Sequence, residues 1–151
     1  MDELEALEKE IWDEMRKTYS ERTLDHALNP RNVGSLPDPD GFASYTGPCG
    51  DTMKIWLKVE NGRIEKATFW TDGCGTTIAA GSAVTELVKG KRVEEALLIS
   101  PEDVLAELGG LPEESRHCAV LAATALKRAL MDYLETKREP WRKAYKCGGM
   151  R

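Results

Sequence analysis

A stretch of strict alternation that runs into an Asn-Gly pair constrains this chain more than any other feature. Between residues 53 and 60, apolar side chains alternate with polar ones or tryptophan, which is the period of a β-strand with one buried face. Asn61-Gly62 is typical of a tight turn, and residues 64–71 have the composition of a return strand. The sequence therefore predicts an antiparallel hairpin.

The register of this hairpin depends on the length of its loop. A two-residue Asn-Gly turn pairs Val59 with Ile64 and leaves Ala67 on the face opposite the apolar side chains of the first strand. A three-residue loop, with Gly62 in the left-handed region, pairs Ile55 with Ala67 and unites the two apolar faces. It does so by turning Ile64 outward. We predict the three-residue loop.

Helical periodicity occupies most of the remaining chain. The expected elements are helices at residues 3–17, from 20 to about 28, from 75 to about 90, 101–108 and 116–138, and a short strand at 42–45. A hairpin followed by successive helices indicates an α+β fold, in which a small antiparallel sheet of about three strands packs against several helices, with an extra N-terminal helix. We expect residues 1–18 to form this extension, 19–138 the main domain and 139–151 a mobile tail.

Charge and length exclude several classes of protein. The formal net charge of −5 over 151 residues speaks against a general nucleic-acid binder, which would carry a basic face. No apolar run approaches the length that spans a bilayer, and the acidic N-terminus is unlike a secretory or transit signal. We therefore expect a cytoplasmic location. A domain of this size folds without metal, so a metal site would be functional.

Four cysteines, at positions 49, 74, 118 and 147, carry the most specific chemistry. None belongs to a CxxC pair, and disulfides are not expected in a reducing compartment. Cys74 is predicted at the start of a helix and Cys118 in the first turn of another, where the helix macrodipole favours a thiolate. Cys49 precedes Gly50, just before the hairpin. We predict that these three thiols share one site, and we interpret Cys147 as an incidental thiol.

A site with three thiolates leaves a tetrahedral soft metal or a [2Fe–2S] unit one protein ligand short. Asp51 and His117, each close to a cysteine in the sequence, are the candidates to complete it. Taken alone, Asp51 would be interpreted as the start of a strand and His117 as the start of a helix. Beside cysteines they become candidate ligands, and the residues do not choose between them.

Four sequence blocks place the chain near a known family. They are HALNPRNVG at residues 26–34, CGD at 49–51, DGCGTTIA at 72–79, and the stretch from LP at 111–112 to HCAVLA at 117–122. In this order and spacing, residues 19–132 resemble the iron–sulfur cluster assembly scaffolds of the IscU type, including the N-terminal domain of NifU.

The resemblance implies a scaffold and carrier rather than an enzyme. By its motif, Cys49, Cys74 and Cys118 are ligands of an iron–sulfur cluster, with Asp51 and His117 lining the same site. A [2Fe–2S] cluster is the expected cargo, and zinc suits the same groups. The implied partners are a cysteine desulfurase, which delivers sulfur to Cys118 as a persulfide, and the apo-proteins that receive the cluster.

Besides Cys147 in the tail, the chain departs from this family at two points. Residues 113–116 read EESR where the bacterial IscU type has a Pro-Val-Lys signal for its dedicated Hsp70-type chaperone, so that partner is not expected. The N-terminal helix precedes the resemblance, and its apolar stripe at Leu4, Leu7, Ile11 and Met15 must dock on this domain or on a second copy. The sequence does not decide between these two arrangements, the second of which would be a homodimer.

Two other functions compete with the scaffold. One is a zinc-bound sulfur relay of the SufU type, which has the same three cysteines and aspartate. That type carries an insertion between its second and third cysteines, and the 43 residues between Cys74 and Cys118 leave no room for it. The other is a zinc-stabilised interaction module, which would give no reason for thiolates at helix starts.

Overall fold

Three antiparallel strands form one sheet in the order β1-β2-β3. The computed structural model describes residues 2–141. Its elements are α1 (Glu3–Thr18), α2 (Glu21–Leu28), β1 (Gly41–Thr46), β2 (Thr52–Glu60), β3 (Arg63–Thr71), α3 (Gly75–Val88), α4 (Val93–Ala96), α5 (Pro101–Glu107), the 3₁₀ turn η1 (Glu113–Ser115) and α6 (His117–Arg138). The predicted α+β fold with a small antiparallel sheet is confirmed. The expected tail beyond residue 141, including Cys147, lies outside the described residues.

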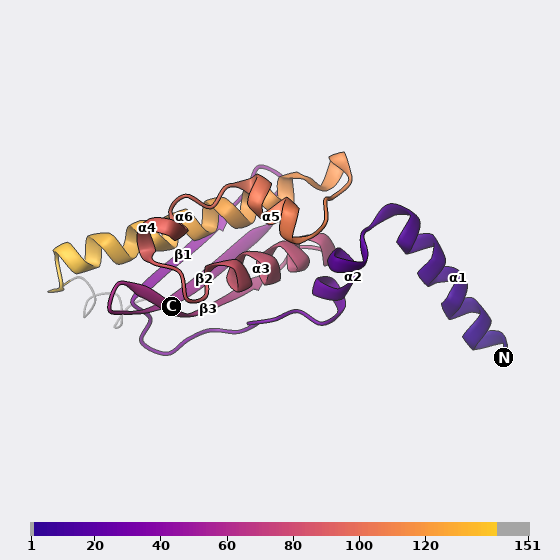
Figure 1. Ribbon diagram of the computed structural model, residues 1–151, viewed down its shortest axis with the longest axis horizontal. Coiled ribbons are helices and arrows are strands. Elements are labelled where there is room, and N and C mark those ends of the chain that lie inside the picture. Colours follow the sequence, from indigo (N-terminus) through magenta and orange to yellow (C-terminus); the bar gives the residue numbers. More distant parts are fainter. Residues whose placement is uncertain (1, 142–151) are drawn as a thin grey trace.

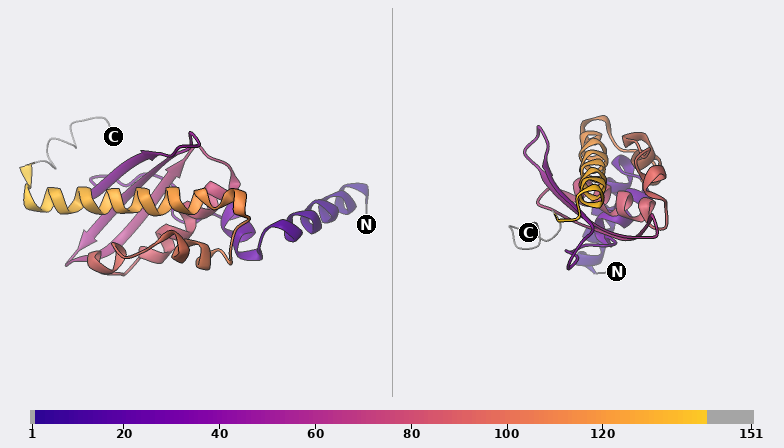
Figure 2. Two further views of the ribbon diagram at one scale, coloured as in Figure 1. Left: turned by 90° about the horizontal axis from the view of Figure 1, so that it is seen from above. Right: turned by 90° about the vertical axis from the view of Figure 1, so that its left-hand side faces the viewer.

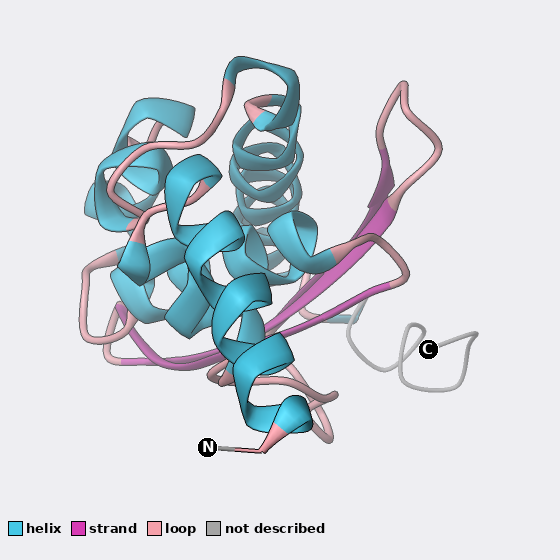
Figure 3. Ribbon diagram, turned by 90° about the vertical axis from the view of Figure 1, so that its right-hand side faces the viewer, coloured by secondary structure: helices cyan, strands magenta, loops and turns pink. Residues whose placement is uncertain are grey.

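The helices gather on one face of the sheet (Figure 1). Figure 2 shows the long α6 crossing the strands, and Figure 3 shows helices packed together on one side of the sheet. Between these layers lies the core, whose fully buried large side chains come from both strands of the hairpin and from the helices: Met53, Ile55, Leu57, Ile64, Phe69, Val84, Val88, Val104, Leu108, Leu126 and Leu130.

The hairpin has a different register from the predicted one. Asn61 and Gly62 form a two-residue turn, both with positive φ, and Val59 pairs with Ile64. The pairing then shifts by one residue, so that Leu57 faces Ala67. A two-residue turn was expected to leave Ala67 on the face opposite the apolar side chains of β2. The bulge removes this difficulty, because one extra residue on β3 reverses the alternation of its side chains. Ile64 is therefore buried rather than turned outward.

Helix α2 is joined to α3 by a buried polar contact. The Nδ1 atom of His26 lies 2.7 Å from the hydroxyl of Ser82, which also accepts a hydrogen bond from the Arg31 amide at 2.9 Å. Burial lowers the pKa of His26. His26 is therefore a packing residue between the two helices.

Small residues let α3 approach the sheet closely. A Cβ atom at Gly81 would lie 2.4 Å from the ring of Phe69 on β3, which is far inside a normal contact. The neighbouring Ala79, Ala80 and Ala83 are also buried. The helix that begins at the second cysteine is thus fixed against the sheet by its lack of bulk.

A Gly81→Ala variant should therefore unfold more easily. Overpacking a core typically costs about 1–3 kcal/mol, and a better helix former returns about 1 kcal/mol. Because the contact with the Phe69 ring would be as short as 2.4 Å, the cost lies at the upper end of this range. We therefore expect a net loss of about 2 kcal/mol in the free energy of unfolding, measured by urea titration. Gly75→Ala is the control, because a Cβ there meets only Ala27 at 4.0 Å. Equal stability of the two variants would contradict this account of the packing.

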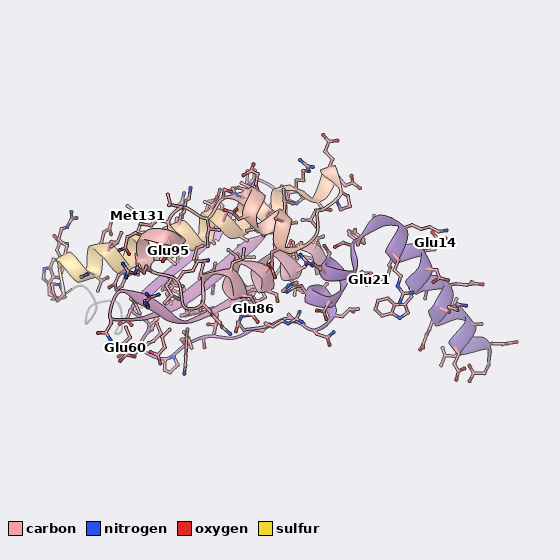
Figure 4. The ribbon with its side chains drawn as sticks, in the orientation of Figure 1. Glu14, Glu21, Glu60, Glu86, Glu95 and Met131 are labelled. Carbon is pink, nitrogen blue, oxygen red and sulfur yellow. The ribbon has the colours of Figure 1, made fainter. Side chains whose placement is uncertain are left out.

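The N-terminal helix α1 stands apart from the domain (Figure 1). Asp2 caps it by accepting a hydrogen bond from the Glu5 amide at 2.8 Å, and none of its residues is buried. Its apolar stripe at Leu4, Leu7 and Ile11 is exposed, and Glu14 lies outside the main body as well (Figure 4). Met15, the last residue of the stripe, is half-buried and lines a pocket together with α2, so that only this end of the stripe contacts the domain. Among residues 2–141, no helix has the length and apolarity to cross a membrane.

Candidate metal centre

The three predicted site cysteines lie at junctions between elements. Cys49 belongs to the turn between β1 and β2, Cys74 is the N-cap of α3, and Cys118 is the second residue of α6. The turn that carries Cys49 is closed by two backbone hydrogen bonds, from Gly50 to the carbonyl of Gly47 at 3.0 Å and from Gly47 to the carbonyl of Asp51 at 2.9 Å. Gly50 has a φ of 92°, which favours glycine at this position.

Hydrogen bonds tie the first two junctions together. The amide of Thr52 donates to a carboxylate oxygen of Asp72 at 2.8 Å, and the hydroxyl of Thr71 donates to the carbonyl of Thr52 at 2.6 Å. The start of β2 is thereby pinned to the end of β3. As a result, Asp51 and Cys74, which flank these strands, lie on neighbouring loops.

The structure brings three of the five predicted residues within reach of one metal ion, and the other two lie beside them. The Sγ of Cys49, a carboxylate oxygen of Asp51 and a ring nitrogen of His117 all lie within 4.8 Å of one another. The Sγ of Cys118 is 3.7 Å from Nε2 of the same histidine. Cys74 joins the group through Thr77, whose hydroxyl lies 3.7 Å from its Sγ. Cys49, Cys74 and His117 are exposed, Asp51 is half-buried and Cys118 is buried.

Thr77 is a site residue that the sequence analysis missed. Its hydroxyl lies 3.2 Å from a carboxylate oxygen of Asp51 and 3.3 Å from the Sγ of Cys118, and its side chain is fully buried. One signal could have revealed it. Thr77 comes three residues after Cys74 on a predicted helix, and residues three apart share a helical face.

The two cysteines at helix starts differ in acidity. A hydrogen bond from the Thr76 hydroxyl, at 3.1 Å, is the main cause that lowers the pKa of Cys74 to about 7, in the expected direction. For Cys118 the expectation of a stabilised thiolate is wrong, because burial raises the pKa of this thiol. Its side chain is only 1% exposed, so loss of solvation outweighs the helix macrodipole.

An apolar pocket of about 200 Å³ opens beside Cys74. The end of α1, helix α2 and residues 74–76 line it. Cys74 is thus reached from solvent at the rim of a hollow large enough for a partner's side chain. Cys118 lies behind Thr77, on the inner side of the same cluster.

Thiol, imidazole and carboxylate groups together form a donor set for a borderline or soft metal. Sulfur and nitrogen ligands select zinc or iron–sulfur units, whereas magnesium and calcium prefer oxygen alone. Two of the three thiols and the imidazole are exposed, so that the centre faces solvent. The fold and the site together define an α+β domain with an open, thiol-bearing candidate metal site.

Comparison with known proteins gives the particular family. Residues 18–140 match the NifU-like N-terminal domain, and the chain belongs to this family. The resemblance seen in the four sequence blocks is thereby confirmed.

Two relatives and two solved structures illustrate the likeness. The chain is 50% identical over 116 residues to the iron–sulfur cluster assembly scaffold protein IscU 1 of Archaeoglobus fulgidus, covering 76% of each chain. It is 48% identical over 126 residues to the scaffold protein IscU of Escherichia coli K12, covering 80% of this chain and 97% of that one.

Among solved structures, a NifU-like N-terminal protein from Brucella abortus superposes with a TM-score of 0.61 at 23% identity, covering 77% of this chain and 94% of that one. A structure described as a scaffold protein for the SUF system, from Fervidobacterium islandicum, gives a TM-score of 0.60 at 20% identity, covering 74% and 96%. At these identities the two structures speak for the fold alone.

Proposed function

We propose that this protein is a scaffold on which iron–sulfur clusters are assembled and from which they pass to apo-proteins. The observation that carries this proposal is that Cys49 lies within 4.8 Å of Asp51 and His117, while Cys74 and Cys118 are connected to this group through Thr77 and His117. The names of the relatives, which are iron–sulfur cluster assembly scaffold proteins, support the same function. The cluster is cargo on such a protein, and the chain acts as a carrier rather than as an enzyme.

The three thiolates are the proposed ligands of the cluster, which we take to be [2Fe–2S]. Either Asp51 or His117 completes the site, since both lie beside the Cys49 sulfur. Thiolate is the stronger partner for cluster iron, and a carboxylate ligand is harder and weaker. A site of mixed strength suits a protein that must both hold a cluster and release it.

A cysteine desulfurase is the proposed source of sulfur, and Cys118 the proposed acceptor. In the transfer, the acceptor thiolate attacks the outer sulfur of the donor persulfide, a new sulfur–sulfur bond forms, and the donor's thiolate leaves. One observation favours a second candidate. Cys74 is exposed and has the lower pKa, so it meets the requirements for a first encounter better than the buried Cys118.

The zinc-bound relay remains the alternative function, because the same groups suit tetrahedral zinc. Between Cys74 and Cys118 the chain forms α3, α4, α5 and η1, whereas the sequence predicts only two helices in this interval. We also propose the cytoplasmic location that the sequence predicts.

Anaerobic reconstitution with iron and a cysteine desulfurase tests the proposal. We expect iron and acid-labile sulfide in equal amounts on the wild-type chain and on a Cys147→Ser control. Loss of both from Cys49→Ser, Cys74→Ser and Cys118→Ser would tie them to the site. Zinc without sulfide, together with stimulation of the desulfurase, would instead indicate the relay. Zinc with no response of the desulfurase would indicate an interaction module.

A further inference from the structure

The hydroxyl of Thr77 stands at the centre of the proposed cluster site. It lies within 3.7 Å of Asp51, Cys74 and Cys118, which come from three different segments of the chain. We propose that Thr77 is a positioning residue, whose hydroxyl sets the orientation of Asp51 and Cys118 for metal binding. This inference rests on the proposed function, because it concerns the same site.

The chemistry of a hydroxyl matches these neighbours. A threonine hydroxyl offers one hydrogen and two lone pairs. Its hydrogen goes to Asp51, because an ionised carboxylate is the strongest acceptor present. The Sγ of Cys118 is the nearest sulfur to the same hydroxyl, at 3.3 Å, within hydrogen-bonding distance for either atom as the donor. One buried group therefore connects the turn before β2 to the start of α6.

The side chain of Thr77 is itself held in a fixed orientation. Thr77 is β-branched, and such residues have few allowed rotamers in a helix. A Cβ atom at Gly73 would lie 2.7 Å from the Cβ and Oγ1 of Thr77. The glycine before the second cysteine thus leaves the space that the threonine fills. A hydroxyl fixed in this way can orient the groups that it contacts.

The same hydroxyl could also serve only to satisfy buried polar atoms, and the two roles predict different results. A residue with a structural role alone affects stability when it is replaced. A residue that orients ligands also affects metal affinity and the geometry of the bound metal, and groups of this kind typically change affinity by about 10–100-fold when removed.

Anaerobic titration with Co²⁺ separates these roles, since its absorption bands report both thiolate ligation and geometry. Thr77→Val keeps the volume and the branched shape but removes the hydroxyl. We expect Co²⁺ to bind this variant about 10–100-fold more weakly, with altered ligand-field bands. Thr77→Ser restores the hydroxyl and should recover wild-type binding.

The matched control is Thr85→Val, which removes a buried hydroxyl two turns further along α3. That hydroxyl donates to the carbonyl of Gly81 at 2.8 Å and contacts no site residue. We expect its Co²⁺ affinity and spectrum to equal those of the wild type. Wild-type binding by Thr77→Val, or equal weakening in Thr77→Ser, would overturn the assignment.

A second measurement needs no metal. In the metal-free chain, cysteine Cβ chemical shifts report side-chain conformation, so Thr77→Val should shift or broaden the Cys118 signal while Thr85→Val leaves it unchanged. An unchanged Cys118 signal in Thr77→Val would overturn the assignment even if the wild type bound no metal through sulfur. A wild-type chain that binds no metal through sulfur would refute the proposed function, whereas an unchanged Cys118 signal refutes only the role of Thr77. The two failures are therefore distinguishable.

Discussion

A Cys118→Ser variant should carry no sulfane sulfur after incubation with a cysteine desulfurase and cysteine, while the wild-type chain gains one sulfur on this residue. Serine has no thiolate to attack the donor persulfide, so the sulfur–sulfur bond cannot form. Serine is close in size to cysteine and keeps a polar atom near Thr77, so we expect the fold to persist. Mass spectrometry of the intact chain and its peptides measures the result, and circular dichroism checks the fold.

Comparison with a Cys74→Ser variant shows which of the two cysteines accepts the sulfur. Cys74 is exposed, and the Thr76 hydroxyl lowers its pKa to about 7, whereas burial raises the pKa of Cys118. If Cys118 is the acceptor, Cys74→Ser should still carry the added sulfur. Sulfane sulfur that persists on Cys118→Ser and disappears from Cys74→Ser would identify Cys74 as the acceptor instead. A Cys147→Ser variant controls for the cysteine outside the described residues.

Asp51→Ala should lengthen the lifetime of a bound cluster several-fold under anaerobic conditions. A carboxylate is a weaker partner for iron than a thiolate, so it provides the point at which a recipient protein can displace the cluster. Asp51 is half-buried and within reach of Cys49 and His117, so its removal leaves a site of stronger ligands. Decay of the visible absorption in the presence of an apo-protein measures the lifetime.

Asp51→Asn distinguishes ligation from orientation at the same position. Asparagine retains an oxygen that can accept the hydrogen bond from Thr77, but it is a poorer ligand than a carboxylate. We expect its cluster to persist as long as that of Asp51→Ala. Decay faster than the wild type in both variants would reject a role for Asp51 in release.

Local pattern predicted the elements well, and failed where tertiary contacts decide. The alternation in β2 is visible because one face of that strand is buried and the other is not. The bulge in β3 could not be predicted, because what fixes it is the burial of both Ile64 and Ala67 against the helices. The four-residue α4 is too short to show a helical repeat in the sequence, so no helix is predicted between residues 91 and 100.

The candidate site also has features that the sequence predicts and features that depend on tertiary contacts. Cysteines at element ends suggested a shared centre, and the structure brings Cys49, Cys74 and Cys118 to adjoining junctions together with Asp51 and His117. The burial of Cys118 was not predictable from its place at a helix start, because α6 packs against α3 through contacts distant in the sequence. A threonine is seldom a metal ligand, so the sequence does not single out Thr77, although its spacing from Cys74 is visible.

Because the site is assembled from three separate junctions, it forms only when the chain has folded completely. A chain still emerging or half-collapsed offers only isolated thiols, which lie 25 or more positions apart along the backbone. Cargo that needs several of these groups at once is therefore refused by an unfinished molecule. By mass action, the loaded molecule is in turn harder to unfold than the empty one. Release of the cluster then returns the protein to its less stable form. Cluster loading and release are therefore coupled to the conformational stability of the chain.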